Sequence, residues 1–260
     1  MYAFDFERPK TIAEAVKALG REDAQALGGG QTLIPTLKQR LASPSVLVSL
    51  NGIKEMIGVR KEGDTLIIGG ATPHAVVAKE ATAYPALAAL AGAIGDPSVR
   101  SRGTIGGSVA NDDPAADYPA AVLASGATVV TNARKIAADD FFQGLFTTAL
   151  EAGEIITEIR FPIPGKANYQ KFQQPASRFA LTGVFVAKTS AGVRVAVTGA
   201  SEDGVFRWTE AEKALSSNFA ASAIAGLTVS ADGMIGDLHG SPAYRAHLVK
   251  VLTGRAVSAA

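Results

Sequence analysis

Two glycine-rich segments carry the residue types that bind phosphate. The first, Gly28-Gly29-Gly30-Gln31-Thr32, precedes apolar residues at helical spacing. Glycine lets a backbone approach a ligand closely, and the free N–H groups at the start of a helix favour an anion. A tight strand-to-helix turn without a ligand uses the same residues, so this segment does not establish a phosphate site by itself.

The second segment, Thr104-Ile105-Gly106-Gly107-Ser108, repeats this chemistry with a hydroxyl on either side of the paired glycines. Two such loops suit the two phosphates of a dinucleotide. A few charge-assisted hydrogen bonds, each contributing about 1.5–3 kcal/mol, offset the several kcal/mol lost when a dinucleotide is immobilised. Binding in the micromolar range or tighter, about −8 kcal/mol, is therefore reachable.

Other nucleotide-binding and hydrolytic motifs are absent from the sequence. Leu33 stands where the third glycine of a Rossmann fingerprint belongs. No Lys-Ser or Lys-Thr pair follows either glycine segment as a P-loop requires, and no Gly-x-Ser-x-Gly elbow indicates a hydrolase. These patterns disfavour a nicotinamide-binding domain and exclude a P-loop nucleotide triphosphatase.

Composition limits the partners and the redox chemistry of the chain. Lysine and arginine number 25 and aspartate and glutamate 24, so net charge draws the 260 residues toward neither nucleic acid nor an anionic membrane. The sequence contains no cysteine, which excludes disulfides and thiolate-held iron–sulfur clusters within it. Any such cluster must belong to a partner.

The histidines and the apolar stretches exclude two further classes. His74, His239 and His247 are scattered without an acid at ligand spacing, so we expect them to be structural or solvent-facing and expect no metal site. The first residues include acids and a proline, unlike a signal peptide. The richest apolar stretch, 83–94, is broken by a proline and is too short to span a bilayer. We expect a cytoplasmic protein without an integral membrane segment.

Local signals predict the elements that position the glycine segments. Thr11 and Glu14 form a capping-box pattern, which predicts a helix over residues 12–19. Residues 24–27 read as a short strand, and a helix is expected to begin at Leu33. The first glycine segment therefore joins a strand to a helix.

The rest of the chain mixes helices and strands. Strands are expected at 46–50, 65–70, 129–131, 155–161, 179–188 and 193–200. Helices are expected to begin at Pro73 and Pro85, to run from Pro119 to Gly126, to follow a capping box at 209–212, and to cover 242–252 with an end at Gly254. The fold class is therefore α+β.

Three separated blocks, 28–35, 94–107 and 111–117, occur in an order that resembles the FAD-binding (medium) subunit of the carbon monoxide dehydrogenase and xanthine dehydrogenase family of molybdenum hydroxylases. The resemblance covers nearly the whole chain. Gly28 and Thr32 replace the usual alanine and serine but keep the needed backbone and hydroxyl. Gln31 occupies a position that is sometimes histidine, which removes a candidate for covalent flavin attachment.

The resemblance implies one non-covalent FAD, with its pyrophosphate wrapped by the two glycine segments. Asp117 matches an acid that contacts the flavin in relatives, although an acid at a helix start ahead of Pro119 has the same appearance. Residues 175–181 lie near the flavin ring in relatives, and we assign no catalytic residue there. The expected cofactor-binding residues are Gly28, Gly29, Gly30, Gln31, Thr32, Thr104, Ile105, Gly106, Gly107, Ser108 and Asp117.

The implied architecture is a two-lobed FAD-binding domain of the PCMH/CO-dehydrogenase flavoprotein type over residues 1–175, with its lobes divided near 55–60. A small C-terminal α+β domain, like the C-terminal domain of the CO-dehydrogenase flavoproteins, is expected over 176–260. In the family the cofactor occupies the cleft between the lobes.

The implied function is electron transfer within a heteromeric molybdenum hydroxylase. A large partner subunit holds the molybdenum cofactor, and a small partner subunit passes electrons through [2Fe–2S] clusters to this FAD, which delivers them to an external acceptor. A dimer of heterotrimers is the expected assembly.

Two alternatives stay open. A free-standing FAD-dependent oxidoreductase of related fold needs its own substrate site and general acid, and the sequence shows no obvious one. A non-catalytic assembly subunit is disfavoured by the intact glycine segments. Flavin content and co-purifying partners distinguish the three.

Overall fold

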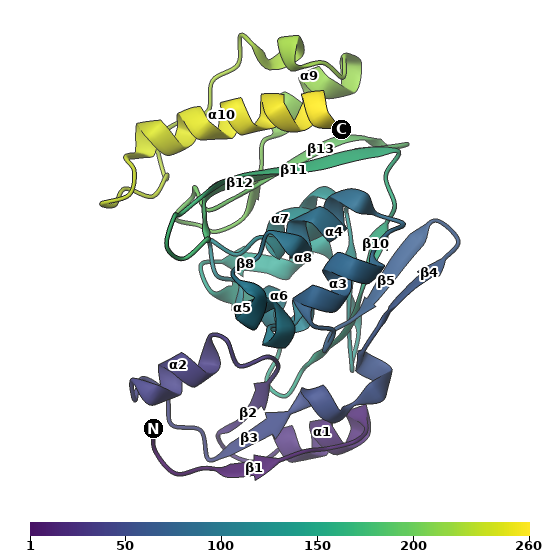
Figure 1. Cartoon of the computed structure of the whole chain (residues 1–260), viewed down its shortest axis with the longest axis vertical. Helices are drawn as coiled ribbons and strands as arrows, with labels where there is room; N and C mark the ends of the chain where they lie inside the picture. Colours follow the sequence, from purple (N-terminus) through teal and green to yellow (C-terminus); the bar gives the residue numbers. More distant parts are fainter.

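The computed structural model describes all 260 residues and contains three main sheets stacked along the long axis of the molecule (Figure 1). A three-stranded parallel sheet has the order β1-β3-β2, a five-stranded antiparallel sheet has the order β4-β5-β10-β6-β7, and a four-stranded antiparallel sheet has the order β11-β12-β13-β14. The α+β class predicted from the sequence is confirmed.

The N-terminal lobe is the smallest of the three layers. Its elements are β1 (Asp5–Glu7), α1 (Ile12–Leu19), β2 (Ala24–Leu27), α2 (Leu33–Lys38) and β3 (Val46–Ser49), followed by the short 3-10 helices η1 (Leu50–Gly52) and η2 (Lys54–Met56). The hydroxyl of Thr11 accepts a hydrogen bond from Glu14 N at 3.2 Å, so α1 begins where the capping pattern predicts. The parallel strands carry the first glycine segment at the end of β2.

The second lobe places its helices on one face of the five-stranded sheet. The strands are β4 (Val59–Glu62), β5 (Thr65–Gly69), β6 (Thr128–Thr131), β7 (Lys135–Ala137) and β10 (Ile156–Pro162). The helices are α3 (His74–Glu80), α4 (Pro85–Gly92), α5 (Pro97–Arg102), α6 (Ile105–Asn111), α7 (Tyr118–Ala124) and α8 (Ala138–Phe141). A two-stranded sheet of β8 (Phe142–Gly144) and β9 (Thr147–Thr148) follows α8.

The C-terminal half is a sheet covered on its outer face by two helices. Its elements are β11 (Lys166–Gln173), β12 (Ala180–Thr189), β13 (Gly192–Thr198), β14 (Phe206–Arg207), α9 (Thr209–Ser217), η3 (Ala221–Ile224) and α10 (Pro242–Ala259). The middle of β12 is buried throughout because α10 covers one face and the second lobe covers the other (Figure 1).

The helices of the second lobe are sandwiched between two sheets. Every residue of α7 is buried, and the largest hydrophobic core joins this helix to Ile159 of β10 and to Phe185 and Ala196 of the C-terminal sheet. Burial of apolar side chains on both sides of this helical layer stabilises the fold by about 25 cal/mol per Å² of buried apolar area. The second lobe and the C-terminal sheet therefore share one core.

Three sequence expectations on secondary structure are wrong. The last helix continues past Gly254 to Ala259, because one glycine costs only about 1 kcal/mol in a helix and α10 packs along the sheet and η3. The 209–212 capping box does not form, since Glu212 instead accepts hydrogen bonds from Val195 N and the Arg207 side chain. Finally, the second glycine segment, expected as a loop, forms most of α6.

The domain division near residue 175 stays a prediction. Residues 166–173, which the expected division assigns to the FAD-binding domain, form strand β11, and this strand pairs with β12 in the C-terminal sheet over its whole length. This pairing favours a division near residue 165. None of the helices combines the length and apolar character needed to cross a membrane.

Candidate functional site

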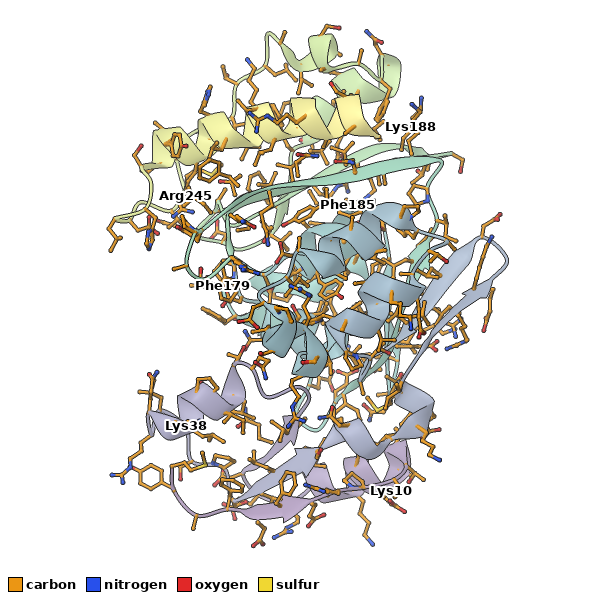
Figure 2. The ribbon with its side chains drawn as sticks, viewed as in Figure 1. Lys10, Lys38, Phe179, Phe185, Lys188 and Arg245 are labelled. Carbon is orange, nitrogen blue, oxygen red and sulfur yellow. The ribbon has the colours of Figure 1, made fainter.

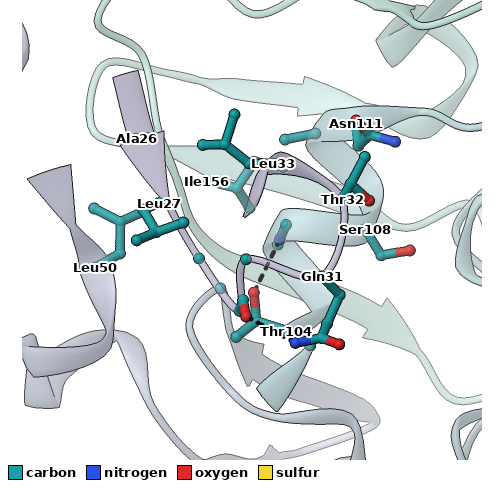
Figure 3. Close-up of a pocket in the computed structure, with 18 of the residues that line it drawn as sticks. Ala26, Leu27, Gln31, Thr32, Leu33, Leu50, Thr104, Ser108, Asn111 and Ile156 are labelled. Carbon is teal, nitrogen blue, oxygen red and sulfur yellow. Dashed lines mark hydrogen bonds between the residues drawn. The ribbon is translucent and has the colours of Figure 1, made fainter. Parts of the chain in front are cut away.

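A cavity of about 440 Å³ lies between the N-terminal and second lobes (Figure 3). This volume is in the range of small-molecule sites, about 300–1,000 Å³. Every predicted cofactor-binding residue except Ile105 lines the cavity. Ile105 instead lies in the hydrophobic core, and its backbone N–H donates to Thr72 O at 3.1 Å. Phe179, which directly precedes β12, also lines the cavity, so the C-terminal sheet contributes to it (Figure 2).

The first glycine segment presents free backbone donors. None of the N–H groups from Gly28 to Leu33 donates a hydrogen bond within the protein. Gly30 has a φ of +72°, a left-handed conformation that favours glycine. A run of unpaired N–H groups in a turn that leads into a helix is an anion-binding arrangement. These donors fit a pyrophosphate.

Gly29 of this segment also packs closely against the second lobe. A Cβ atom on Gly29 would overlap the carbonyl oxygen of Arg102 and the Cα atom of Gly103. The segment is further held by Asn51, whose Nδ2 donates to Gly28 O at 3.0 Å. The glycine run therefore serves close packing between the lobes as well as access for a ligand.

In the second glycine segment, the backbone N–H groups of both glycines donate hydrogen bonds within the protein. Gly106 N donates to Gly70 O at 2.9 Å, and Gly107 N donates to Thr104 Oγ1 at 3.2 Å, which caps α6. A Cβ on Gly106 would collide with Gly70 O at 2.5 Å, whereas a Cβ on Gly107 would meet only Thr104 Oγ1 at 2.9 Å. Both glycines line the cavity, but Gly106 is required for packing against Gly70, whereas Gly107 is exposed and meets only one side-chain hydroxyl.

Side chains add hydroxyl and amide groups around these backbones (Figure 3). The hydroxyl of Ser108 forms no hydrogen bond within the protein, nor does that of Thr32, and Asn111 lies beside them on the cavity wall. Gln31 donates through Nε2 to Gly29 O at 3.2 Å, so its amide supports the loop. The site thus offers neutral donors and bare glycine surface.

Asp117, which also lines the cavity, lies in a buried charge cluster. Tyr169 OH donates to Asp117 Oδ1 at 2.6 Å, and Lys171 Nζ lies 2.9 Å from the same oxygen. Burial raises the pKa of Asp117, while Lys171 and Tyr169 oppose this rise. Sequence reasoning missed Tyr169 and Lys171. Their spacing of two residues on one strand, which places both on one face, was the available signal.

His74 is a third residue that the sequence analysis did not place in the site. Its side chain is 5% exposed, lines the cavity, and packs against Tyr118 with ring centroids 5.3 Å apart. Burial, with Arg100 nearby, lowers the pKa of His74 to about 4. The imidazole is therefore neutral at pH 7. His239 and His247 are exposed, and no three histidine, aspartate or glutamate side chains converge as a metal site requires.

Asp112 is buried immediately beside the cavity wall. It ends α6 in a left-handed conformation with φ of +44°, and neither carboxyl oxygen has a hydrogen-bond partner. Burial, together with Asp113, raises the pKa of Asp112 to about 7. This carboxyl is thus partly protonated at neutral pH.

The fold and the cavity define a two-lobed flavoprotein of the PCMH/CO-dehydrogenase type. Residues 2–164 match the family described as FAD binding domain in molybdopterin dehydrogenase. The carbon monoxide dehydrogenase medium chain of Hydrogenophaga pseudoflava is 33% identical to this chain over 99% of this chain and 96% of its own. The nicotine 6-hydroxylase medium subunit of Paenarthrobacter nicotinovorans is 33% identical over 98% and 96%.

Solved structures agree with the sequence relatives. Carbon monoxide dehydrogenase from Hydrogenophaga pseudoflava superimposes with a TM-score of 0.90 at 34% identity, covering 100% of this chain and 97% of that one. Quinoline 2-oxidoreductase from Pseudomonas putida superimposes with a TM-score of 0.89 at 28% identity, covering 100% and 97%. The chain belongs to the family of FAD-binding domains in molybdopterin dehydrogenases. It is an oxidoreductase flavoprotein subunit of the molybdenum hydroxylase type, with FAD as its cofactor.

Proposed function

We propose that this chain is the electron-transfer subunit of a heteromeric molybdenum hydroxylase. Its FAD takes electrons from [2Fe–2S] clusters in a small partner subunit and passes them to an external acceptor. The observation that carries the proposal is the cavity between the lobes, which is lined by residues 28–33, whose N–H groups are unpaired, and by Gly107 and Ser108. The absence of cysteine supports placing the clusters in a partner.

The residues of this chain bind and orient the cofactor. The free N–H groups from Gly28 to Leu33 hold the pyrophosphate, and the hydroxyls of Thr32 and Ser108 add neutral donors. Gly107 lets the phosphate approach the α6 backbone, because no side chain stands there. Asp117 lines the same cavity as an acceptor. When bound, FAD supplies the reversible acceptance of electrons.

The names of the relatives, medium chain or medium subunit, support a heteromeric assembly. We propose a large partner with the molybdenum cofactor and a small iron–sulfur partner, arranged as a dimer of heterotrimers. The cytoplasmic location expected from the sequence stays a prediction. The substrate is set by the large partner and is not encoded in this chain.

Cofactor binding is tested by titrating the full-length apoprotein. We expect one non-covalent FAD per chain, which should stay in the supernatant when acid precipitates the protein. FMN, which lacks the second phosphate and the adenosine, should bind much more weakly. A folded protein that takes up no FAD contradicts the proposal.

Division of labour is tested by stopped-flow bleaching of the flavin. Substrate should bleach the flavin of the reconstituted complex and leave the isolated chain unreacted, while dithionite should reduce both. Rapid bleaching of the isolated chain by substrate would instead favour the free-standing oxidoreductase. A chain that holds FAD but is never reduced within the complex would favour the assembly subunit.

A further inference from the structure

The side chain of Lys171 joins three segments that surround the cavity. Its Nζ lies 2.9 Å from Asp117 Oδ1 and donates to Ala93 O at 2.9 Å and to Arg178 O at 2.9 Å. An ammonium group has three N–H donors, so these contacts use its full capacity. The side chain is 5% exposed. Lys171 therefore holds the end of α4, the start of α7 and the segment after β11 around one buried charge.

The contact with Asp117 also controls which carboxyl oxygen faces the ligand. Tyr169 and Lys171 both engage Oδ1, which leaves Oδ2 available to the cavity that Asp117 lines. A carboxylate buried without a cation is costly, and desolvation disfavours its charged form. The ammonium group of Lys171 therefore favours the charged form of Asp117, which is the hydrogen-bond acceptor at the cavity wall.

The contact with Arg178 O fixes a short segment at the cavity mouth. Residues 174–178 form one turn, closed by a 2.9 Å hydrogen bond from Arg178 N to Gln174 O. Arg178 has a φ of +62°, which a non-glycine residue adopts only when its surroundings hold it there. Phe179, which lines the cavity, follows directly. Lys171 thus also determines where this aromatic ring lies.

We propose that Lys171 is a positioning residue of the FAD site, which orients Asp117 on one side and holds the 174–179 segment at the mouth on the other. The proposal rests on the proposed binding of FAD in this cavity. Lys171 lies outside residues 2–164, which match the FAD-binding family. The C-terminal sheet accordingly completes a cofactor site that the two preceding lobes begin.

The test compares two readouts in the full-length chain. FAD affinity is measured by fluorescence titration, and closure of the segment is measured as the rate of tryptic cleavage after Arg178, normalised to cleavage after the distant Arg40. Both arginines are exposed. Lys171→Met should weaken FAD binding by about tenfold or more. This is the size of effect expected when one hydrogen bond to a charged group is lost. The variant should also raise the relative cleavage after Arg178 several-fold.

Two further variants separate the two contacts. Asp117→Asn should weaken FAD binding but leave cleavage after Arg178 unchanged, because Lys171 keeps its contacts with Ala93 and Arg178. Lys188→Met is the matched control, an exposed lysine at the far end of the same sheet (Figure 2), and should change neither readout. A merely structural lysine would lower the melting temperature without changing the FAD affinity of the folded protein.

If Lys171→Met does not fold, Lys171→Arg takes its place. Arginine keeps the charge but spreads its donors over a planar fork, so one nitrogen does not reach all three acceptors. Lys171→Arg should also weaken FAD binding and raise cleavage after Arg178, but by less than Lys171→Met. Unchanged FAD affinity together with unchanged cleavage after Arg178 in a folded Lys171 variant would overturn the proposal. Wild-type protein that binds no FAD would instead contradict the proposed function.

Discussion

A Cβ atom placed on Gly28 would lie 2.8 Å from Oγ1 of Thr104, so the two glycine segments lie in close contact at this point. Thr104 belongs to the second lobe and caps α6, whereas Gly28 directly follows β2 of the N-terminal sheet. The glycines expected to serve a phosphate therefore also set the distance between the lobes. Substitutions at different glycines can therefore test the packing role and the binding role separately.

Gly29→Ala tests the packing role. The new methyl group would overlap Arg102 O and Gly103 Cα, and backbone atoms there cannot move aside without separating the lobes. We expect a loss of about 3 kcal/mol or more of unfolding free energy, at the upper end for overpacking. Urea denaturation of the apoprotein measures it. The control, Gly226→Ala, adds a methyl in open space and should stay within about 0.5 kcal/mol.

Gly107→Val tests the binding role. Gly107 is exposed and a Cβ there meets only the Thr104 hydroxyl, so the fold should survive while the side chain blocks approach of the phosphate. FAD affinity should fall by at least about tenfold, equivalent to about 1.4 kcal/mol. The control is Gly92→Val, an exposed helical glycine on α4 whose added Cβ makes ordinary contact with Ala78. Retention of wild-type affinity by Gly107→Val would remove α6 from the pyrophosphate site.

Gly30→Val is a poor substitute for that test. The left-handed φ of +72° and a Cβ contact of 2.9 Å with Ile34 Cγ1 strain any side chain at this position. Loss of flavin in this variant would accompany loss of fold. The structure therefore separates two glycines that the sequence made equivalent.

Asp112→Asn should stabilise the protein at alkaline pH. The folded-state pKa of Asp112 is raised from 3.8 to about 7, so the folded state binds the proton more tightly and its stability falls as pH rises from 3.8 through 7. The full penalty, present above pH 7, is about 4 kcal/mol at most by the linkage relation. Urea denaturation should show the asparagine variant more stable at pH 8, with the difference shrinking toward pH 5. A difference independent of pH would show that Asp112 is ionised in the fold without cost.

His74→Leu should reduce acid sensitivity. Because the pKa of His74 is lowered from 6.5 to about 4, the unfolded state takes up its proton first, and stability is lost as pH falls from 6.5 to 4. The loss amounts to about 3 kcal/mol at most. Denaturation of wild type and variant at pH 7 and pH 4.5 measures the difference. An equal loss in both proteins would exclude His74 as its source.

Much of the fold was predictable because the signals are local. Thr11 and Glu14 begin α1 where their pattern predicts, and residues 24–27 form a strand ahead of the first glycine segment. The errors come from packing between distant residues. Gly254 does not end α10 because neighbouring elements support the helix, and Glu212 leaves its expected cap for partners on β13 and β14.

The candidate site likewise contains residues that local sequence signals predicted and residues that only packing between distant segments brings together. Ten residues named from the glycine segments and Asp117 line one cavity, because sequence neighbours on a tight turn stay neighbours in space. Ile105 belongs to the core, since its place in the first turn of α6 turns the side chain inward. The spacing of Tyr169 and Lys171 places both on one face of β11, but they reach Asp117 only because the C-terminal sheet packs against the second lobe, and the spacing does not reveal this contact.

The position of β10 has a consequence for synthesis of the chain. This strand lies at the centre of the five-stranded sheet, between β5 and β6, yet it is the last of the five to be translated. The two halves of the sheet, β4-β5 and β6-β7, must therefore wait as separate hairpins with unpaired inner edges until residue 162 has left the ribosome. Non-local pairing of this kind slows folding and exposes strand edges to other chains. Aggregation during overexpression should accordingly originate at these edges, and a chaperone that covers them should raise the yield of folded apoprotein.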